Sequence, residues 1–441
     1  MSPAARRTTL TLLAMVYGFG FADRVVIALV AQQLKAEFRI SDLEIGLLGG
    51  TAFALINVIA SLPLARLADR TSRKLVAVGS LLVGSLFTAL CAASASFAQL
   101  LVLRLGMAAG SAGTEAPAHS LISDMYAPGR RASALSLFML GVPLASIVGS
   151  ALGAGVAEHF GWRVTFLIFG TCGLFVVAVA LFAMREPPRH APATPALPPQ
   201  SAAGVIATMW GSHAFRHVMA GTGLVGLASF AINTFLPAFF VRSHGLGIGD
   251  AGLTFGLVSG VGSTIGSLAG GYGSERLARR NAGWLIGVPA LGLLIGAPIM
   301  VMGVATTALP AAIVLILIGS SFSYMAMGPA IAILHGLLDP RSRATGSALF
   351  LMVVYVVGQG VGPPLGGFVS DTLAAMHYDA AGYARHCAGA AGQIVRSRCA
   401  AASGAGLRDA IACFALSWLW SGAHYALAAR QLMRSGTLVA A

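Results

Sequence analysis

The chain has 441 residues, of which 57% are hydrophobic and only 10% are charged, and its mean hydropathy is +0.82. Soluble proteins carry about 25% charged residues, so this composition excludes a soluble surface and indicates a polytopic membrane protein. The net charge of +13 would favour nucleic-acid binding in a soluble chain. In a membrane protein it is explained by basic loops that face the cytoplasm, and we expect no nucleic-acid partner.

Twelve apolar runs are long enough to span a bilayer, which takes about 20 residues. The first run follows the N-terminus directly and lacks a small-residue cleavage site, so we expect it to be retained as a span. The predicted spans cover residues 8–32, 44–66, 75–96, 98–122, 132–156, 163–184, 214–240, 250–273, 283–303, 308–335, 342–369 and 409–432.

A proline-rich segment separates the sixth and seventh spans. Residues 185–203 contain six prolines, which block helix formation and favour an extended linker. We therefore expect an N-terminal six-helix half over residues 1–184, a cytoplasmic linker over 185–213 and a C-terminal six-helix half over 214–441. The predicted cytoplasmic segments carry roughly twice as many basic residues as the outer ones, which places both termini in the cytoplasm. A polar periplasmic loop is expected at about 371–408.

Cysteines and glycines give few signs of chemistry. Cys387 and Cys399 both fall in the predicted outer loop, where they can pair if the loop is periplasmic. The other three cysteines lie in apolar spans and are expected to be core residues. The stretch Gly221–Gly226 matches a dinucleotide-binding pattern but lies inside a span, so it predicts helix packing. No metal-ligand spacing and no nucleophile with its base is present, and we expect no metal, cofactor or catalytic centre.

One charged motif occurs in two predicted cytoplasmic loops. Residues 65–74 read "ARLADRTSRK" between the second and third spans, and residues 271–280 read "GYGSERLARR" between the eighth and ninth. In both, a small residue precedes an acidic residue and an arginine, and two basic residues follow, so that Asp69 matches Glu275. Two copies separated by about half the chain indicate an internal repeat.

This motif resembles the cytoplasmic loop signature of the major facilitator superfamily, G-x-L-x-D-R-x-G-R-R, with the small residues Ala65 and Ser72 at its two glycine positions. The resemblance covers the whole chain and implies an all-α transporter with 12 transmembrane helices in two six-helix halves, and not an enzyme. In that family the acid and the arginines latch the two halves together on the cytoplasmic side. The implied cytoplasmic gate consists of Asp69, Arg70, Arg73, Lys74, Asp124, Glu275, Arg276 and Arg280.

Three further stretches resemble the spinster-like branch of this superfamily: "YGFGFADRVVIALV" in the first span, "EAPAHSLISDMYAPGRR" after the fourth and "SALFLMVVYVVGQGVGPPLGG" in the eleventh. The resemblance implies transport of amphipathic lipids such as lysophospholipids, with proton coupling in some members. The organic anion:cation symporter branch also carries Asp-Arg in the first span, so an organic-anion:proton symporter is an alternative, and a receptor without transport is another. Arginine far outnumbers lysine, as in proteins from GC-rich bacterial genomes, so we expect a bacterial inner membrane. We also expect a monomer.

Charged residues inside the spans are candidates for function, because an arginine or aspartate at mid-helix costs about 2.5–3.5 kcal/mol. Asp23 and Arg24 lie in the middle of the first span, and Arg104 lies in the fourth. On a continuous helix, Ser111 and Glu115 would face the same way as Arg104. His119 would follow Glu115 by one further turn, within reach of a side-chain contact.

The proton site has three alternatives. Spinster-like proteins usually carry a glutamate at the position of Ser111, so Glu115 takes over this role, or Asp23 is the only protonation site, or proton coupling is absent. We expect a shared network of Asp23, Arg104 and Glu115, in which an anionic headgroup competes for the arginine and lets a carboxylate bind a proton. The competing interpretation is that these groups only tie two spans together.

The second half contributes polar but uncharged candidates to the predicted cavity. A mostly apolar wall opposite a charged one suits an amphipathic substrate with an anionic or zwitterionic headgroup. The candidates are Asn233, Tyr324, Tyr355 and Gln359.

Overall fold

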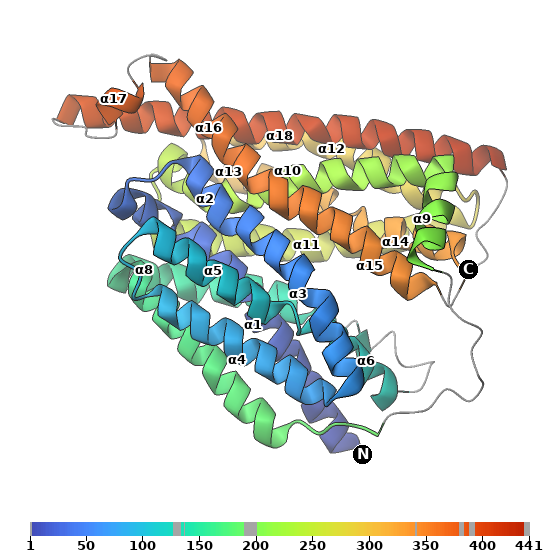
Figure 1. Ribbon diagram of the computed structural model, residues 1–441. Helices are drawn as coiled ribbons and strands as arrows, with labels where there is room; N and C mark the ends of the chain where they lie inside the picture. Colours follow the sequence, from blue (N-terminus) through green and yellow to red (C-terminus); the bar gives the residue numbers. More distant parts are fainter. Residues whose placement is uncertain are drawn as a thin grey trace. The chain divides into compact units, whose positions relative to one another are not determined.

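The computed structural model is built from helices (Figure 1). It describes residues 2–126, 134–135, 137–188, 201–339, 342–378, 383–387 and 393–435. Within these ranges no strand occurs, and ten helices are long and apolar enough to cross a membrane. One of them, Leu137–Ala183, holds both the fifth and the sixth predicted spans. The fourth span is divided between two shorter helices. The predicted all-α membrane fold is confirmed.

The chain forms two compact units. The first comprises Met1–Ala193, Leu236–Val241 and Gly245–Gly256, and the second comprises Thr194–Phe235, Arg242–His244 and Leu257–Ala441. The helices of the first unit are α1 (Pro3–Phe38), α2 (Asp42–Gly49), α3 (Thr51–Arg70), α4 (Arg73–Cys91), α5 (Phe97–Ser111), α6 (Glu115–Met125) and α8 (Gly141–Ala183).

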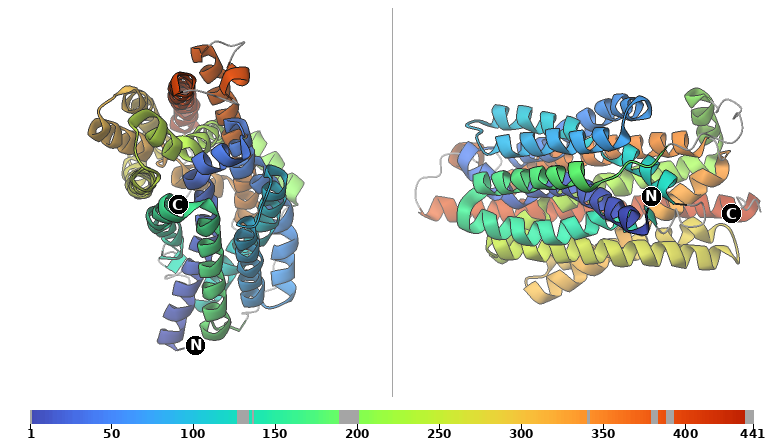
Figure 2. Two further views of the ribbon diagram at one scale, coloured as in Figure 1. Left: turned by 90° about the vertical axis from the view of Figure 1, so that its left-hand side faces the viewer. Right: turned by 90° about the horizontal axis from the view of Figure 1, so that it is seen from below.

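Apolar side chains and serine caps organise the first unit. Helix α1 packs along α8, and α4 packs against α5 and α8. Helix α8 breaks at Gly161, whose φ of 82° is readily adopted only by glycine, so its two arms run in opposite directions (Figure 2). A capping box of Ser41 and Glu44 begins α2, and Ser72 caps α4. The core includes Leu13 and Phe138, both fully buried.

The second unit runs from the end of the linker to the C-terminal helix. Its elements are α9 (Ala202–Gly211), most of α10 (His213–His244), most of α11 (Ile248–Ala278), α12 (Trp284–Ala305), α13 (Leu309–Ser323), α14 (Met327–Leu337), α15 (Arg343–Val353), a π-helix (Val354–Val361), α16 (Gly362–Tyr378), α17 (Tyr383–Cys387) and α18 (Gln393–Ser435).

Two predicted spans break at the same place in the repeat. The fourth span is interrupted between Ser111 and Glu115, and the tenth between Ser323 and Met327. In each case a proline, Pro117 or Pro329, stands two residues into the following helix. A proline has no N–H and its ring clashes with the carbonyl four residues earlier, so the hydrogen-bond ladder cannot continue. The expectation of one continuous helix from Arg104 to Glu115 is wrong for this reason.

The linker and the outer loop contain more helix than the sequence suggested. Residues 189–200 lie outside the described part, but α9 occupies most of 201–213, because the prolines end before it and Ser201 caps its first turn. Of the predicted loop at 371–408, α16 continues to Tyr378 and α18 already begins at Gln393. Cys387 and Cys399 form a disulfide that joins α17 to α18, with their Cα atoms 5.7 Å apart.

Candidate functional site

A buried arginine on α5 is the centre of the charged site in the first unit. Arg104 is 1% exposed, and its Nη1 donates hydrogen bonds to the main-chain oxygen of Asp23 (2.9 Å) and to Sδ of Met107 (3.0 Å). Its Nε and Nη2 are buried and have no hydrogen-bond partner among the described residues. A buried cation with unfilled donors is costly unless an acceptor arrives, so this geometry fits an anion.

Asp23 on α1 lies beside this arginine. Its side chain is 5% exposed, and the charges that act on its carboxyl are those of Arg104 and, more weakly, Arg24. Within the described residues Arg104 bonds to the main chain of Asp23 and not to its carboxylate. The two charges are therefore close enough to stabilise each other while the arginine keeps donors for a third group.

Arg24 belongs to a different contact. Its guanidinium lies over the ring of Phe53 on α3, 4.2 Å from the ring centre, and 5.7 Å from that of Phe21. Cation–π contacts of this kind contribute about 0.5–2 kcal/mol. Arg24 thus connects α1 with α3, whereas Arg104 connects α5 with α1.

The helix break separates the other predicted members of the network. The hydroxyl of Ser111, 8% exposed, donates to the Ala108 oxygen (3.0 Å) and accepts from the Asn57 amide (3.4 Å). Glu115 begins α6, and it acts on His119 but is not among the charges that act on Arg104. His119 packs edge-on against Phe138 with ring centres 5.4 Å apart. The structure therefore brings Asp23 and Arg104 together and leaves Glu115 with His119.

In the second unit, two predicted residues contact each other directly, and an unpredicted serine joins them. The side-chain oxygen of Asn233 on α10 accepts hydrogen bonds from the hydroxyl of Ser259 on α11 (3.0 Å) and from that of Tyr324 (3.4 Å). Its amide donates to the main-chain oxygen of Ser229 (2.8 Å). This polar cluster carries no charge, as expected for the second half.

The other two candidates lie in the π-helix. Gln359 is 3% exposed, and its Oε1 is buried without a partner among the described residues. The ring of Tyr355 lies 6.5 Å from that of Phe230. Pro363 and Pro364 follow directly and offer no N–H to the preceding turn, which favours local widening of the helix. Such π segments are frequent at functional sites.

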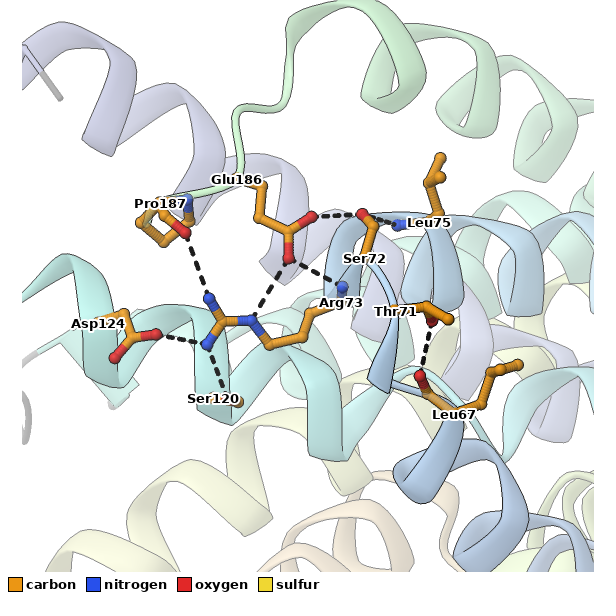
Figure 3. A network of polar contacts seen from close by, with 9 residues as sticks. All are labelled: Leu67, Thr71, Ser72, Arg73, Leu75, Ser120, Asp124, Glu186 and Pro187. Atoms are coloured by element: carbon orange, nitrogen blue, oxygen red, sulfur yellow. Dashed lines mark hydrogen bonds and ion pairs between the residues drawn. The ribbon is translucent and has the colours of Figure 1, made fainter. Parts of the chain in front are cut away.

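The first copy of the repeated loop forms a dense network around Arg73 (Figure 3). This side chain is buried at the start of α4, and its Nη1 donates to Asp124 (2.5 Å) and to Ser120 (3.0 Å), both on α6. Its Nε donates to Glu186 (3.4 Å), and its Nη2 donates to the main-chain oxygen of Pro187 (3.3 Å). One arginine thus joins α4, α6 and the segment that follows α8.

Glu186 and Ser72 are functional candidates that the sequence analysis missed. The Ser72 hydroxyl donates to Glu186 and accepts from the Leu75 N–H (3.1 Å), so serine at a family glycine position caps α4. The Arg73 N–H also donates to Glu186 (2.9 Å). A signal was present, because Glu186 is the only acidic residue between Glu158 and Asp250. An isolated acid behind a span needs a cationic partner.

These hydrogen bonds favour the ionised form of Glu186. Partial burial alone would raise its pKa, but hydrogen bonds from the Ser72 hydroxyl and from Arg73 outweigh burial and hold the pKa below the ordinary 4.5. A lowered pKa in the folded protein means that the ionised group stabilises the fold above pH 4.5. This stabilisation is lost as the pH falls through the folded-state pKa.

We expect Glu186→Gln to lower the thermal unfolding midpoint by a few degrees at pH 7, because a charged hydrogen-bond acceptor contributes about 1–3 kcal/mol. The difference from the wild type should shrink when melting is measured below pH 4.5. Glu275→Gln, which removes an exposed carboxylate of the second loop, is the matched control and should melt like the wild type. Equal midpoints for wild type and Glu186→Gln at pH 7 would contradict the assignment.

The remaining gate residues are distributed unequally between the two copies. Arg70 is exposed, and Lys74 donates to the main-chain oxygen of Leu181 (2.7 Å). The Asp69 side chain lies outside the described residues. The second-copy residues are exposed, and across the described ranges none of them forms an ion pair: Glu275, Arg276 and Arg280. In the first copy of the loop motif, Arg73 is therefore bonded to residues of its own unit, whereas the charged side chains of the second copy are exposed.

Across the described residues the chain is helical, with charges buried inside its spans and a loop motif that occurs twice, and these features are those of a polytopic membrane transporter. The sequence model of the Major Facilitator Superfamily matches residues 12–363, and the chain belongs to that superfamily. Within it, the chain is a spinster-like transporter.

Relatives and solved structures agree with this placement. An MFS-type efflux pump of Mycolicibacterium smegmatis is 31% identical over 365 residues, which cover 82% of this chain and 83% of the relative. Human protein spinster homolog 1 is 28% identical over 397 residues, covering 85% and 74%. The crystal structure of a bacterial homolog of the human lysosomal transporter spinster, inward-facing and unoccupied, matches with a TM-score of 0.88 and 27% identity, covering 99% of this chain and 100% of that one.

Proposed function

We propose that the protein moves an amphipathic molecule with an anionic headgroup across a bacterial inner membrane, coupled to protons. The observation that carries the proposal is Arg104, which is buried while its Nε and Nη2 lack acceptors among the described residues. An arginine fork matches a phosphate or carboxylate with two parallel hydrogen bonds. Both termini are taken to be cytoplasmic and the protein to act as a monomer.

The coupling follows from the neighbouring carboxyl. Without substrate, the charge of Arg104 favours the ionised form of Asp23. When an anionic headgroup accepts hydrogen bonds from Arg104, it competes for that charge, and the Asp23 carboxylate takes up one proton from the water on the open side. When the substrate leaves, the charge of Arg104 again acts on the Asp23 carboxyl, and Asp23 then releases its proton. Glu115 acts electrostatically on His119, and we leave both residues outside this exchange.

The second unit supports an amphipathic substrate. Its candidate groups around Asn233 and Gln359 are uncharged hydrogen-bonding partners, and the stretches of helix around them are mostly apolar. A chain with polar ester or hydroxyl groups fits such a surface better than a compact polyanion. The relatives described as an efflux pump and as spinster homologs support the movement of a small molecule across the membrane.

We assign the gate to the charges at the cytoplasmic ends of the spans. The Arg73 network with Asp124 and Glu186 holds α4, α6 and the segment after α8 as one body. The exposed charges, among them Arg70 and Glu275, make the gate contacts that form and break as the carrier changes state.

Uptake by the purified protein in liposomes tests the substrate class. We expect radiolabelled lysophosphatidylglycerol to be accumulated when an inward proton gradient is imposed, and a sugar acid such as gluconate to be ignored. Accumulation of gluconate that lysolipid does not inhibit would favour the organic-anion:proton symporter. No transport and no substrate-dependent pH change with either compound would favour a receptor and contradict the proposal.

A further inference from the structure

Four basic or imidazole side chains gather where α10 begins and α18 passes beside it. Arg216 and His213 are exposed on the first turn of α10, and Nη2 of Arg216 donates to Nδ1 of His213 (2.7 Å). One residue further, Nδ1 of His217 lies 2.9 Å from Nδ1 of His424 on α18. This group, the α10–α18 cationic cluster, lies at the opposite end of α18 from the Cys387–Cys399 disulfide (Figure 1).

The cluster has hydrogen-bond donors to spare. An arginine has five N–H donors and no acceptor, and one nitrogen of Arg216 is bonded within the described residues. In the His217–His424 pair one Nδ1 donates and the other accepts, so the accepting ring carries its N–H on Nε2, which is directed away from the contact and is unbonded in the same part of the chain. These outward groups can bind an acceptor from the surroundings.

Among the described residues, no carboxylate forms an ion pair with this cluster. The groups that act on His217 are His424, Arg216 and His213, all of them basic or neutral. Helix α12, which packs along α18, has no titratable residue between Trp284 and Ala305. Helix α9, just before the cluster, has none either. The cluster therefore presents unbalanced positive charge, and an anion is its complementary partner.

Exposed tryptophans on α18 and α9 border the cluster. Trp420 on α18 is 63% exposed, with its ring 6.2 Å from that of His424. Trp210 ends α9 three residues before His213 and is 52% exposed, whereas Met209 beside it is buried. Tryptophan with one apolar and one polar edge is typical of the headgroup level of a bilayer. The cluster thus lies at the depth of lipid phosphates.

The helices below the cluster are fixed to each other. The Thr222 hydroxyl lies 2.9 Å from the Tyr425 hydroxyl, and the Ser421 hydroxyl donates to the main-chain oxygen of Gly221 (2.6 Å). All of these groups except Gly221 carry side chains that are at most 2% exposed. The spacing between Arg216 and the histidine pair is therefore set before any ligand arrives, which reduces the cost of binding.

We propose that the α10–α18 cationic cluster binds the phosphate of an anionic phospholipid from the surrounding leaflet. Arg216 donates to the two non-bridging phosphate oxygens, and one ring of the histidine pair donates through Nε2 to one of them. The two tryptophans contact the glycerol region, and the apolar surface of α10 and α18 carries the acyl chains. The lipid would hold the start of α10 at the membrane surface, next to the end of the linker.

The test measures binding of dioleoylphosphatidylglycerol to the full-length protein in detergent by native mass spectrometry, with dioleoylphosphatidylcholine as reference. We expect Arg216→Gln to weaken the phosphatidylglycerol complex about tenfold, and Arg216→Gln with His217→Gln to weaken it further. Arg216→Lys should lose less, because it keeps a point charge. Arg434→Gln is the matched control: it removes an exposed arginine at the end of α18 and should bind like the wild type.

A variant could bind poorly because it is misfolded. Thermal unfolding of each variant with and without lipid separates misfolding from loss of the binding site. Phosphatidylglycerol should raise the unfolding midpoint of the wild type and of Arg434→Gln but should raise that of Arg216→Gln by less than half as much. Inorganic phosphate should raise none of them. Equal lipid affinity of wild type and both glutamine variants would overturn the proposal. An equal effect of inorganic phosphate and phosphatidylglycerol would also overturn it, because the site would then serve free anions.

Discussion

Arg104→Gln is expected to reduce uptake to the level of empty liposomes. Glutamine keeps part of the volume but loses the charge and the paired N–H donors that a headgroup would engage. Arg104→Lys should retain less than a tenth of the wild-type rate, since an ammonium group cannot form the two parallel hydrogen bonds. Substrate-gradient uptake measures both, and Arg7→Gln, which removes an exposed arginine near the N-terminus, should transport normally.

A structural role for Arg104 predicts a different pattern. Removing one member of a buried charge pair costs about 3–5 kcal/mol, so each variant must first be shown to be folded by size-exclusion chromatography and thermal melting. The double variant Asp23→Asn with Arg104→Gln removes both charges and should recover much of the lost stability. If Arg104 only tied α5 to α1, this double variant would also recover uptake. Recovery of uptake, or normal uptake by Arg104→Gln alone, would contradict the proposed substrate contact.

Asp23→Asn is expected to abolish the response of uptake to an imposed pH gradient, whereas Glu115→Gln should leave that response intact. The structure places Asp23 beside Arg104, and among the described residues Arg104 forms no hydrogen bond with Glu115. An amide cannot take up the proton that substrate binding would drive onto the carboxylate. Initial uptake rates at several outside pH values, with the inside pH fixed, measure the effect.

The glutamate variant separates the alternatives that the sequence left open. If Glu115→Gln lost the gradient response and Asp23→Asn kept it, the proton site would lie on α6 despite the helix break. If neither changed the response, transport would not be proton-coupled through either group. Both variants keep the size of the original side chain, so a change in rate reports charge and not packing.

The sequence predicted the fold because the membrane spans are long apolar runs. The charged residues within these runs are easily recognised. Asp23 and Arg104 were found in this way, since a charge inside an apolar run is rare and costly. The break after Ser111 was not predicted, although Pro117 marks it, because hydropathy does not report the hydrogen-bond ladder. The same reasoning, applied to Pro329, would have found the second break.

Long-range contacts account for most of what the sequence analysis missed. Glu186 lies 113 residues from Arg73, and no local pattern joins an acid after the sixth span to an arginine before the third. The meeting of His217 with His424 spans 207 residues and was equally invisible. Helix α9 was missed for a local reason, because the prolines that precede it dominated the assignment of the whole linker.

Proton uptake on substrate binding tests the central claim most directly. Titration calorimetry of lysophosphatidylglycerol into the detergent-solubilised protein, in buffers with different ionisation enthalpies, counts the protons exchanged for each ligand bound. The account predicts uptake of up to about one proton per ligand by the wild type, and none by Asp23→Asn with binding retained. Binding by the wild type with no proton exchange, or the same exchange by Asp23→Asn, would contradict it.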